Sequence, residues 1–238
     1  MSSTLFIADL HLDSARPAVL VALAQFLSQQ SNCDRLYILG DLFDAWIGDD
    51  DDAPFVTEVA AILRAFTAAG PELFIMQGNR DFLLGDAFCQ AVGAQLLPDP
   101  TVIDLYGEPT LLMHGDSLCT GDKEYQAFRN TARDPQWQAQ LLALELPERR
   151  ALAAQMRSMS REANSNKAED IMDVTPSEVE KVMRDHGVKQ LIHGHTHRPA
   201  QHIVSTGKRW VLGDWDSRGW AIAVSTEEIE LTNFHIIQ

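Results

Sequence analysis

The amino-acid sequence predicts an α/β fold, and three observations carry this prediction. Short apolar runs recur along the chain, and each ends at Gly, Asn, Asp or His, as buried strands often do. Stretches with a helical pattern separate the first of these runs. Five of the runs lead directly into side chains that can bind a metal ion, and ligands of open α/β proteins sit just beyond the carboxyl ends of the strands.

The predicted elements alternate between strands and helices, with extra strands at the end. Strands are predicted at residues 5–8, 36–39, 72–77, 102–105, 110–113, 190–192, 200–205, 209–213, 219–225 and 228–234. Helices are predicted at residues 16–30, 54–69, 86–92 and 176–186. Pro17 lies near the start of its helix, where proline is tolerated, and Thr175-Pro176 predicts a capped helix start. Tyr106-Gly107-Glu108 predicts a hairpin turn.

The stretch from about residue 120 to about 170 has a different character. It favours helix and shows no strand pattern, so we predict a single domain over residues 1–238 with a helical insertion, or cap, at about 120–170. Residues 120–167 hold eight Lys/Arg and six Asp/Glu, whereas the whole chain has a net charge of −15. A locally basic cap would suit an anionic substrate or lipid surface, although the composition alone favours helices with mixed charges that only face solvent.

The composition limits the classes of protein to which the chain can belong. Its 238 residues and 45% hydrophobic content are typical of a globular protein, and no run of about 18 apolar residues predicts a transmembrane helix. Residues 1–10 lack the basic start and long apolar stretch of a secretory signal. Three widely spaced cysteines match no zinc pattern and predict reduced thiols in the cytoplasm. The negative charge disfavours nucleic-acid binding, and no obligate protein partner is expected.

Five predicted strands end in a metal-capable side chain, and in four of them a glycine lies beside it. The motifs are Asp9-Leu10-His11, Gly40-Asp41, Gly78-Asn79-Arg80-Asp81, His114-Gly115-Asp116 and Gly194-His195-Thr196-His197. Glycine lets the backbone turn sharply and approach a ligand closely. Each motif alone also occurs in ordinary solvated loops, but their recurrence predicts five strand ends that meet at one side of one sheet.

Together the motifs supply imidazole, carboxylate and amide ligands. This mixture suits Mn²⁺, Fe²⁺ or Zn²⁺ better than Ca²⁺, and the carboxylate of Asp41 could bridge two ions. Two ions about 3.5–4 Å apart are the usual clamp for in-line attack on phosphorus. The candidate metal ligands are Asp9, His11, Asp41, Asn79, His114, His195 and His197.

In this order, D-x-H, G-D, G-N-x-[DE], H-G-D and G-H-T-H resemble the motifs of the calcineurin-like metallophosphoesterases, and they span residues 9–197. The resemblance implies a four-layer α/β/β/α sandwich that holds two divalent metal ions. It assigns the first ion to Asp9, His11, Asp41 and His197. It assigns the second ion to Asp41, Asn79, His114 and His195.

Longer stretches narrow the resemblance within this family. GDLFDAWIGDD at 40–50, GNRDFLLG at 78–85, MHGDSLCTGDKEYQ at 113–126, MSREANSNKAEDIMDV at 159–174 and LGDWDSRGW at 212–220 are similar to the branch that cleaves a nucleotide-linked acylated sugar in lipid A biosynthesis. This similarity implies hydrolysis of the pyrophosphate bond of UDP-2,3-diacylglucosamine to UMP and 2,3-diacylglucosamine 1-phosphate, by attack of a dimetal-activated water on the α-phosphorus. It also implies Mn²⁺ as the metal and a peripheral position on the cytoplasmic face of the inner membrane.

The same similarity implies which residues contact the substrate. The expected substrate-binding residues are Asn79, Arg80, Asp122, Ser160, Asn164, Lys167 and His195. The expected catalytic residues are Asn79, Arg80 and His114. Ser160, Asn164 and Lys167 are spaced so that they share one face of a helix. Several apolar residues could line an acyl-chain channel, although packing between helices explains them equally well: Tyr125, Phe128, Trp137, Leu141, Leu152, Met156 and Met159.

Arg80 departs from the pattern of the broader family that this chain resembles, because many members of that family carry His at this position. A His can protonate a poor leaving group, whereas Arg cannot donate a proton near neutral pH. Arg can, however, bind phosphate oxygens through two hydrogen bonds at once. Cleavage of a pyrophosphate expels a phosphate monoester, which needs little protonation. Arg80 therefore fits a pyrophosphatase better than a monoesterase.

Two other functions stay open at this point. One is a broader metal-dependent phosphoesterase that acts on a soluble nucleotide or a phosphoprotein, and the other is a non-catalytic scaffold on the same sandwich. A scaffold is expected to lose ligands, whereas all seven positions are filled here. Outside the ligand set, Asp116 and His193 are expected to support the ligands, residues 49–52 to form a solvated turn, and Asp44 and Asp214 to have no direct role.

Overall fold

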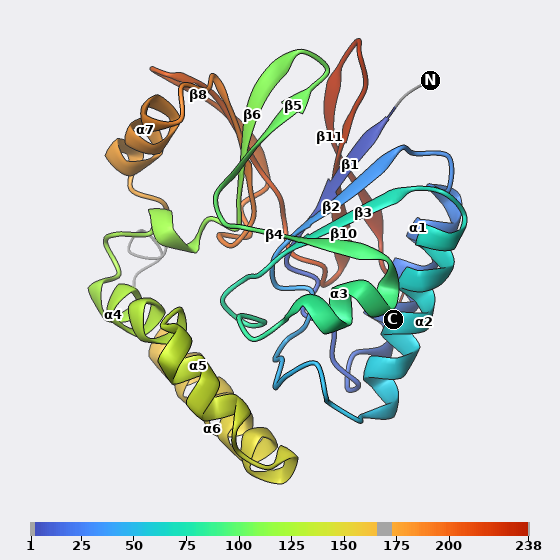
Figure 1. Cartoon of the computed structure of the whole chain (residues 1–238). Coiled ribbons are helices and arrows are strands. Elements are labelled where there is room, and N and C mark those ends of the chain that lie inside the picture. Colours follow the sequence, from blue (N-terminus) through green and yellow to red (C-terminus); the bar gives the residue numbers. More distant parts are fainter. Residues whose placement is uncertain (1–2, 166–172, 238) are drawn as a thin grey trace.

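Two β-sheets packed face to face form the centre of the protein, and helices cover their outer faces (Figure 1). The structure, a computed structural model, describes residues 3–165 and 173–237. From one side to the other, the layers are helix, sheet, sheet and helix. The four-layer α/β/β/α sandwich expected from the sequence is therefore confirmed.

The larger sheet contains six strands. They are β1 Thr4–Ile7, β2 Arg35–Leu39, β3 Glu72–Met76, β4 Ala94–Leu97, β10 Arg218–Val224 and β11 Ile229–His235. The order is β11-β10-β1-β2-β3-β4, in which β1 to β4 are parallel and β10 and β11 are antiparallel. β4 was not predicted, because this edge strand is only half-buried and shows no alternation of apolar and polar residues.

The smaller sheet contains five strands. They are β5 Thr101–Leu105, β6 Glu108–Met113, β7 Gln190–His193, β8 Ala200–Val204 and β9 Gly207–Val211. The order is β5-β6-β7-β9-β8, with β6, β7 and β9 parallel and the two edge strands antiparallel. The predicted hairpin is confirmed as the pair β5–β6, and it belongs to this second sheet.

Alternation along the strands fills the space between the two sheets. In β1, Leu5 and Ile7 face the helices, whereas Phe6 faces the smaller sheet. The aromatic rings of Phe6, Tyr37 and Phe74 stack across three neighbouring strands, with successive centroids 5.0 and 4.7 Å apart. Strands that bury both faces in this way read as continuous apolar runs, which explains why they were recognisable in the sequence.

Four helices cover the outer faces of the sheets. They are α1 Pro17–Gln29, α2 Pro54–Ala68 and α3 Asp86–Val92 on the larger sheet, and α7 Pro176–Asp185 on the smaller one. In α1, the buried residues Val19, Leu23 and Phe26 recur every three or four positions and form one apolar face. The four predicted helices are confirmed. Thr175 occupies the N-cap position of α7 but makes no capping hydrogen bond with its side chain, and its hydroxyl accepts a hydrogen bond from Thr120.

Three further helices form an arm that extends away from the sheets (Figure 1). They are α4 Lys123–Ala132, α5 Pro135–Leu142 and α6 Leu146–Ser165, and they follow the short 3₁₀ helix η1 Asp116–Leu118. Ala132 is the one buried residue of α4, and α5, which is fully described, has none. Across residues 3–165 and 173–237, no helix is long and apolar enough to cross a membrane.

Ion pairs tie α6 to the acidic loop between β2 and α2. Arg149 Nη1 and Nη2 lie 2.7 and 2.5 Å from the two carboxylate oxygens of Asp50, and Arg150 Nη2 lies 2.7 Å from Asp51 Oδ1. Asp49 accepts hydrogen bonds from main-chain N–H groups at the start of α3. The structure has the predicted turn, with Asp50 and Asp52 exposed to solvent, and the carboxylates of this loop also fasten the arm and α3 to the body.

Candidate metal centre

The loops after β1, β2, β3, β6 and β7 meet at one end of the sandwich and bring the seven predicted ligands together. In chain order these ligands are Asp9, His11, Asp41, Asn79, His114, His195 and His197. Because β6 and β7 belong to the smaller sheet, the expectation that all five strands share one sheet is wrong. Local sequence patterns identify a strand but do not reveal which sheet it joins.

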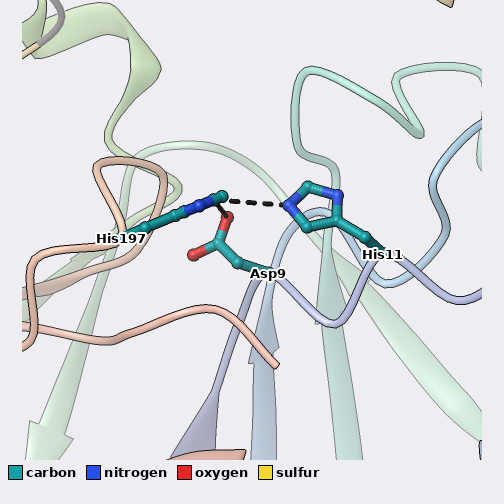
Figure 2. Close-up of side chains that lie close together, drawn as sticks. All are labelled: Asp9, His11 and His197. Atoms are coloured by element: carbon teal, nitrogen blue, oxygen red, sulfur yellow. Dashed lines mark hydrogen bonds and ion pairs between the residues drawn. The ribbon is translucent and has the colours of Figure 1, made fainter. Parts of the chain in front are cut away.

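A first group of ligand atoms comes from the loops after β1 and β7. Figure 2 shows Asp9, His11 and His197 facing one another. Nε2 of His11 lies 3.3 Å from Nε2 of His197, which in turn lies 3.5 Å from Oδ1 of Asp9. Oδ2 of Asp41 lies 3.8 Å from Nδ1 of His11.

A second group surrounds the amide oxygen of Asn79. This Oδ1 lies 2.9 Å from Nε2 of His114 and 2.8 Å from Nδ1 of His195. Oδ1 of Asp41 lies 3.8 Å from Nε2 of His114. Asp41 thus presents one carboxylate oxygen to each group, which is the arrangement required of a bridging ligand.

The backbone at the site is unusual in its dihedral angles. Five candidate ligands have positive φ values in the left-handed region: Asp9 (55°), His11 (47°), Asp41 (52°), His195 (67°) and His197 (55°). Residues with side chains rarely adopt this conformation, and it gathers at functional sites, where the surrounding structure enforces it.

Glycines let these loops approach one another closely. A Cβ atom on Gly78 would lie 2.1 Å from Oδ1 of Asp41, and one on Gly194 would lie 2.4 Å from Oδ2 of Asp9. Both distances are far shorter than any real contact, so only glycine fits beside the two carboxylates.

The charges at the site favour bound cations. Burial lowers the pKa of the His114 and His197 imidazoles, but the carboxylates of Asp9 and Asp41 outweigh burial and raise the pKa of both rings to about 9. Oδ1 of Asp9 is buried and has no hydrogen-bond partner among the described residues. Divalent ions would satisfy this oxygen and take the place of the attracted protons, so the residues present fit a two-ion centre.

Asp81 supports the site and was missed as a functional residue, although it belongs to the quoted motif. Its fully buried carboxylate accepts hydrogen bonds from the backbone N–H groups of Gly78 (2.7 Å), Leu42 (2.8 Å) and Asp41 (3.2 Å). It therefore holds the loop that carries Asp41 against the turn that carries Asn79. A carboxylate two residues after Asn79 was the available sequence signal.

Two other carboxylates lie behind candidate histidine ligands. Oδ2 of Asp214 lies 3.6 Å from Nδ1 of His197, and Oδ1 of Asp44 lies 4.0 Å from Nδ1 of His11. Asp44 is itself bound by Arg157 of α6, whose Nε lies 2.8 Å from Oδ2. Carboxylates in such places orient metal-binding imidazoles, a role that the sequence analysis did not give them.

Asp116 joins the loop after β6 to the arm. Its buried Oδ2 accepts hydrogen bonds from the Tyr125 hydroxyl (2.5 Å) and from Arg129 Nε (2.8 Å). The Tyr125 ring in turn stacks on the imidazole of His195, with centroids 5.8 Å apart. His193 bonds through Nδ1 to the carbonyl of its neighbour Gly194, so the contacts of both residues fit supporting positions.

Asp99 has a buried carboxyl group that makes only a long ion pair with Arg129 among the described residues. Its two oxygens have no hydrogen-bond partner in the part of the chain that the structure describes, and Arg129 Nη2 is 3.9 Å away. Burial and the negative charge of Asp116 raise the pKa of Asp99 from its ordinary 3.8 to about 6. Asp99 therefore binds a proton more tightly in the folded protein than in the unfolded one. The stability that this proton contributes to the fold is fully present below about pH 4 and is lost as the pH rises through about 6.

We expect Asp99→Asn to raise the free energy of unfolding at neutral pH. The pKa difference corresponds to at most about 3 kcal/mol, and the gain should shrink as the pH falls from about 6 toward about 4. Thermal unfolding at about pH 7.5 and about pH 5 measures this gain in stability, with Asp104→Asn, a substitution of an exposed residue, as a control. A variant less stable than wild type at neutral pH would contradict the prediction.

An apolar cavity of about 400 Å³ opens beside the candidate centre. Asn79, Arg80 and Ser160 line it together with the arm residues Tyr125, Phe128, Leu141, Leu152, Met156 and Met159 and the body residues Trp46, Phe82 and Leu83. Six of the seven apolar residues singled out in the sequence thus line one cavity. The seventh, Trp137, packs against the rings of Phe82 and Phe128.

The remaining substrate-binding candidates are placed differently. Arg80 Nη1 donates a hydrogen bond to Ser160 Oγ (3.2 Å), so these two residues meet at the cavity. Asp122 caps α4, because its carboxylate accepts a hydrogen bond from the N–H of Tyr125 (3.0 Å). The side chain of Asn164 and the whole of Lys167 lie outside the described residues.

The whole chain is similar to proteins that share one name. UDP-2,3-diacylglucosamine hydrolase of Cellvibrio japonicus is 55% identical over 98% of this chain and 100% of its own length. The protein of the same name from Pseudomonas aeruginosa is 52% identical over 93% of this chain and 95% of its own. A family model described as calcineurin-like phosphoesterase matches residues 2–199.

Two solved structures share the architecture at low sequence identity. A novel archaeal phosphodiesterase is 11% identical, with a TM-score of 0.51 over 98% of this chain and 99% of its own. A hypothetical protein of Pyrococcus horikoshii is 12% identical, with a TM-score of 0.52 over 99% of this chain and 88% of its own. At this level of identity, the likeness establishes the fold alone.

Proposed function

This chain belongs to the calcineurin-like phosphoesterase family, and from that premise we propose that it hydrolyses the pyrophosphate bond of UDP-2,3-diacylglucosamine to UMP and 2,3-diacylglucosamine 1-phosphate. The observation that carries the proposal is a candidate two-ion centre that adjoins an apolar cavity. The centre suits a pyrophosphate, and the cavity suits acyl chains. Relatives that are more than half identical over nearly their whole length and carry the name of this hydrolase support the assignment.

Proteins of this family use a dimetal centre, and we propose Mn²⁺ as the metal, because mixed imidazole, carboxylate and amide ligands suit it. The first ion would be held by Asp9, His11, Asp41 and His197. The second would be held by Asp41, Asn79, His114 and His195. When bound, two such ions provide an activated water for attack on the α-phosphorus and neutralise charge on the phosphate oxygens.

Arg80 is proposed to bind the pyrophosphate. It lines the cavity beside Asn79, and its Nε is buried without a hydrogen-bond partner among the described residues. A guanidinium with an unused donor in such a place suits a phosphate oxygen. Its fixed charge would favour departure of the sugar phosphate without proton donation. Asp122, Ser160, Asn164, Lys167 and His195 are proposed to hold the sugar and the remaining polar groups.

The arm is proposed to form a cap that receives the acyl chains and to contact the membrane from which the lipid comes. Leu142 at the end of α5 is 42% exposed, Leu144 between α5 and α6 is 36% exposed, and Met159 of α6 is 61% exposed. Exposed apolar residues on the arm suit shallow insertion into a lipid surface. We propose a peripheral position on the cytoplasmic face of the inner membrane.

The test is hydrolysis of UDP-2,3-diacylglucosamine in detergent, with Mn²⁺ and ¹⁸O-labelled water. We expect turnover, label in UMP, and loss of turnover on adding a chelator. Label in the sugar phosphate would reverse the direction of attack and contradict the role of Arg80. Failure to cleave the lipid, together with rapid cleavage of a soluble phosphodiester, would replace the proposal with a broader phosphoesterase.

A further inference from the structure

The turn after β3 carries both Asn79 and Arg80, and it is held from the body side by two main-chain donors. The N–H of Gly78 donates to Asp81 Oδ1 (2.7 Å), and the N–H of Arg80 donates to Asp41 Oδ1 (2.8 Å). These two bonds use main-chain N–H groups, so they do not involve the carbonyl oxygens of Gln77 and Gly78 at the start of the turn.

Arg133, which ends α4, binds those carbonyl oxygens from the arm side. Its Nη2 donates to the carbonyls of Gly78 (3.0 Å) and Gln77 (3.2 Å), and its Nη1 donates to Oε1 of Gln77 (2.7 Å). The amide nitrogen of Gln77 then donates to the carbonyl of Leu84 (2.6 Å). One guanidinium therefore fixes the start of the turn and, through Gln77, its far end.

The turn has little freedom to move without disturbing the site. The absent Cβ of Gly78 would already overlap Asp41, at 2.1 Å from Oδ1. One residue later, the amide oxygen of Asn79 lies within 2.9 Å of ring nitrogens of both His114 and His195. A small shift of the turn would therefore change the distances among the atoms proposed to hold the second ion.

The other contacts of α4 fix the loop that carries His114. Arg129 Nε donates to Asp116 Oδ2 (2.8 Å), and Gln126 Nε2 donates to the carbonyls of Asp116 (2.8 Å) and Cys119 (3.1 Å). Because Arg133 lies at the end of the same helix, α4 spans the two loops that contribute Asn79 and His114.

We propose that Arg133 is a positioning residue for the second metal site: by binding the Gln77 and Gly78 carbonyls, it keeps Asn79 in place relative to His114 and His195. This inference rests on the proposed function only in taking the centre to bind two divalent ions. Lysine cannot replace Arg133 fully, because a single ammonium group cannot reproduce three hydrogen bonds from one plane.

The experiment measures Mn²⁺ binding to the metal-stripped full chain by calorimetry, with kcat and KM measured separately. For Arg133→Ala we expect one of two Mn²⁺ equivalents to bind about 10–100-fold more weakly, with the other equivalent nearly unchanged. Arg133→Lys should lie between Arg133→Ala and wild type. Two equivalents bound with wild-type affinity by Arg133→Ala would overturn the proposal.

Arg64→Ala is the matched control, because Arg64 also donates to a main-chain carbonyl, that of Ala91, but far from the site (2.7 Å). An equal loss of Mn²⁺ affinity in this control would reduce Arg133 to a general structural role and overturn the proposal. If Arg133→Ala fails to fold, Arg133→Lys provides the same test. Because Mn²⁺ binding requires no substrate, weak Mn²⁺ binding by Arg133→Ala would stand even if wild type did not cleave the lipid.

Discussion

Replacing Asp41 by Ala should lower kcat on UDP-2,3-diacylglucosamine by about 10³-fold or more. Asp41 presents one oxygen toward His11 and the other toward His114, so its loss would affect both proposed ions at once. Metal ions contribute several kcal/mol of transition-state stabilisation, and each tenfold in rate corresponds to about 1.4 kcal/mol. Steady-state kinetics and the metal content of the purified variant are the two measurements.

The control for this prediction is Asp104→Ala, which removes a carboxylate of β5 that accepts a hydrogen bond from the N–H of Gly107 in the hairpin turn (3.0 Å). It should keep wild-type kinetics and two bound ions. Asp41→Ala enzyme that retained more than about a tenth of wild-type kcat with two ions bound would refute the bridging role.

Asp116→Ala should have the largest effect on stability, lowering the free energy of unfolding by about 3–5 kcal/mol. The Asp116 carboxylate is completely buried, and the substitution would leave Arg129 and the Tyr125 hydroxyl without their shared acceptor. The penalty arises mainly from the Arg129 guanidinium, which would lose its hydrogen-bonded carboxylate and keep the more distant Asp99 at 3.9 Å, while only a minor part of its side chain reaches solvent. Urea denaturation followed by tryptophan fluorescence measures the effect.

An exposed ion pair provides the contrast. Lys181 and Asp185 lie 2.6 Å apart, one turn from each other on α7, and both side chains are more than half exposed. Asp185→Ala should cost far less stability than Asp116→Ala, because solvent screens an exposed ion pair. If Asp116→Ala cost as little as this control, the buried hydrogen-bond group around Asp116 would not stabilise the fold.

Most of the helices and strands, and the candidate ligands themselves, could be predicted from the sequence because the pattern that marks them is local. Each ligand directly follows a buried strand, so a short window holds both the apolar run and the polar residue that ends it. Grouping the strands into two sheets required the family resemblance, because pairing depends on residues far apart in the chain. β4 was missed because a half-exposed edge strand lacks the pattern that marks the others.

The supporting contacts could not be predicted because they join distant segments. Arg149 and Asp50 are 99 positions apart, and Arg133 and Gln77 are 56 positions apart. Nothing in the neighbourhood of either arginine distinguishes it from an ordinary charge on a solvent-facing helix. Asp81 is different: its place in the motif was visible, but its four main-chain donors come from two loops that only the fold brings together.

The five left-handed residues of the site have a consequence for how such a protein evolves. A left-handed residue with a side chain costs about 1–2 kcal/mol, whereas glycine adopts the same conformation freely. Selection for heat resistance or expression alone would therefore favour glycine where Asp9 or His197 now stands, and each such replacement would remove a ligand. Only continuous selection for the chemistry keeps these side chains in place. Where that selection is absent, we expect the fold to be kept and to gain stability while the candidate metal ligands are lost.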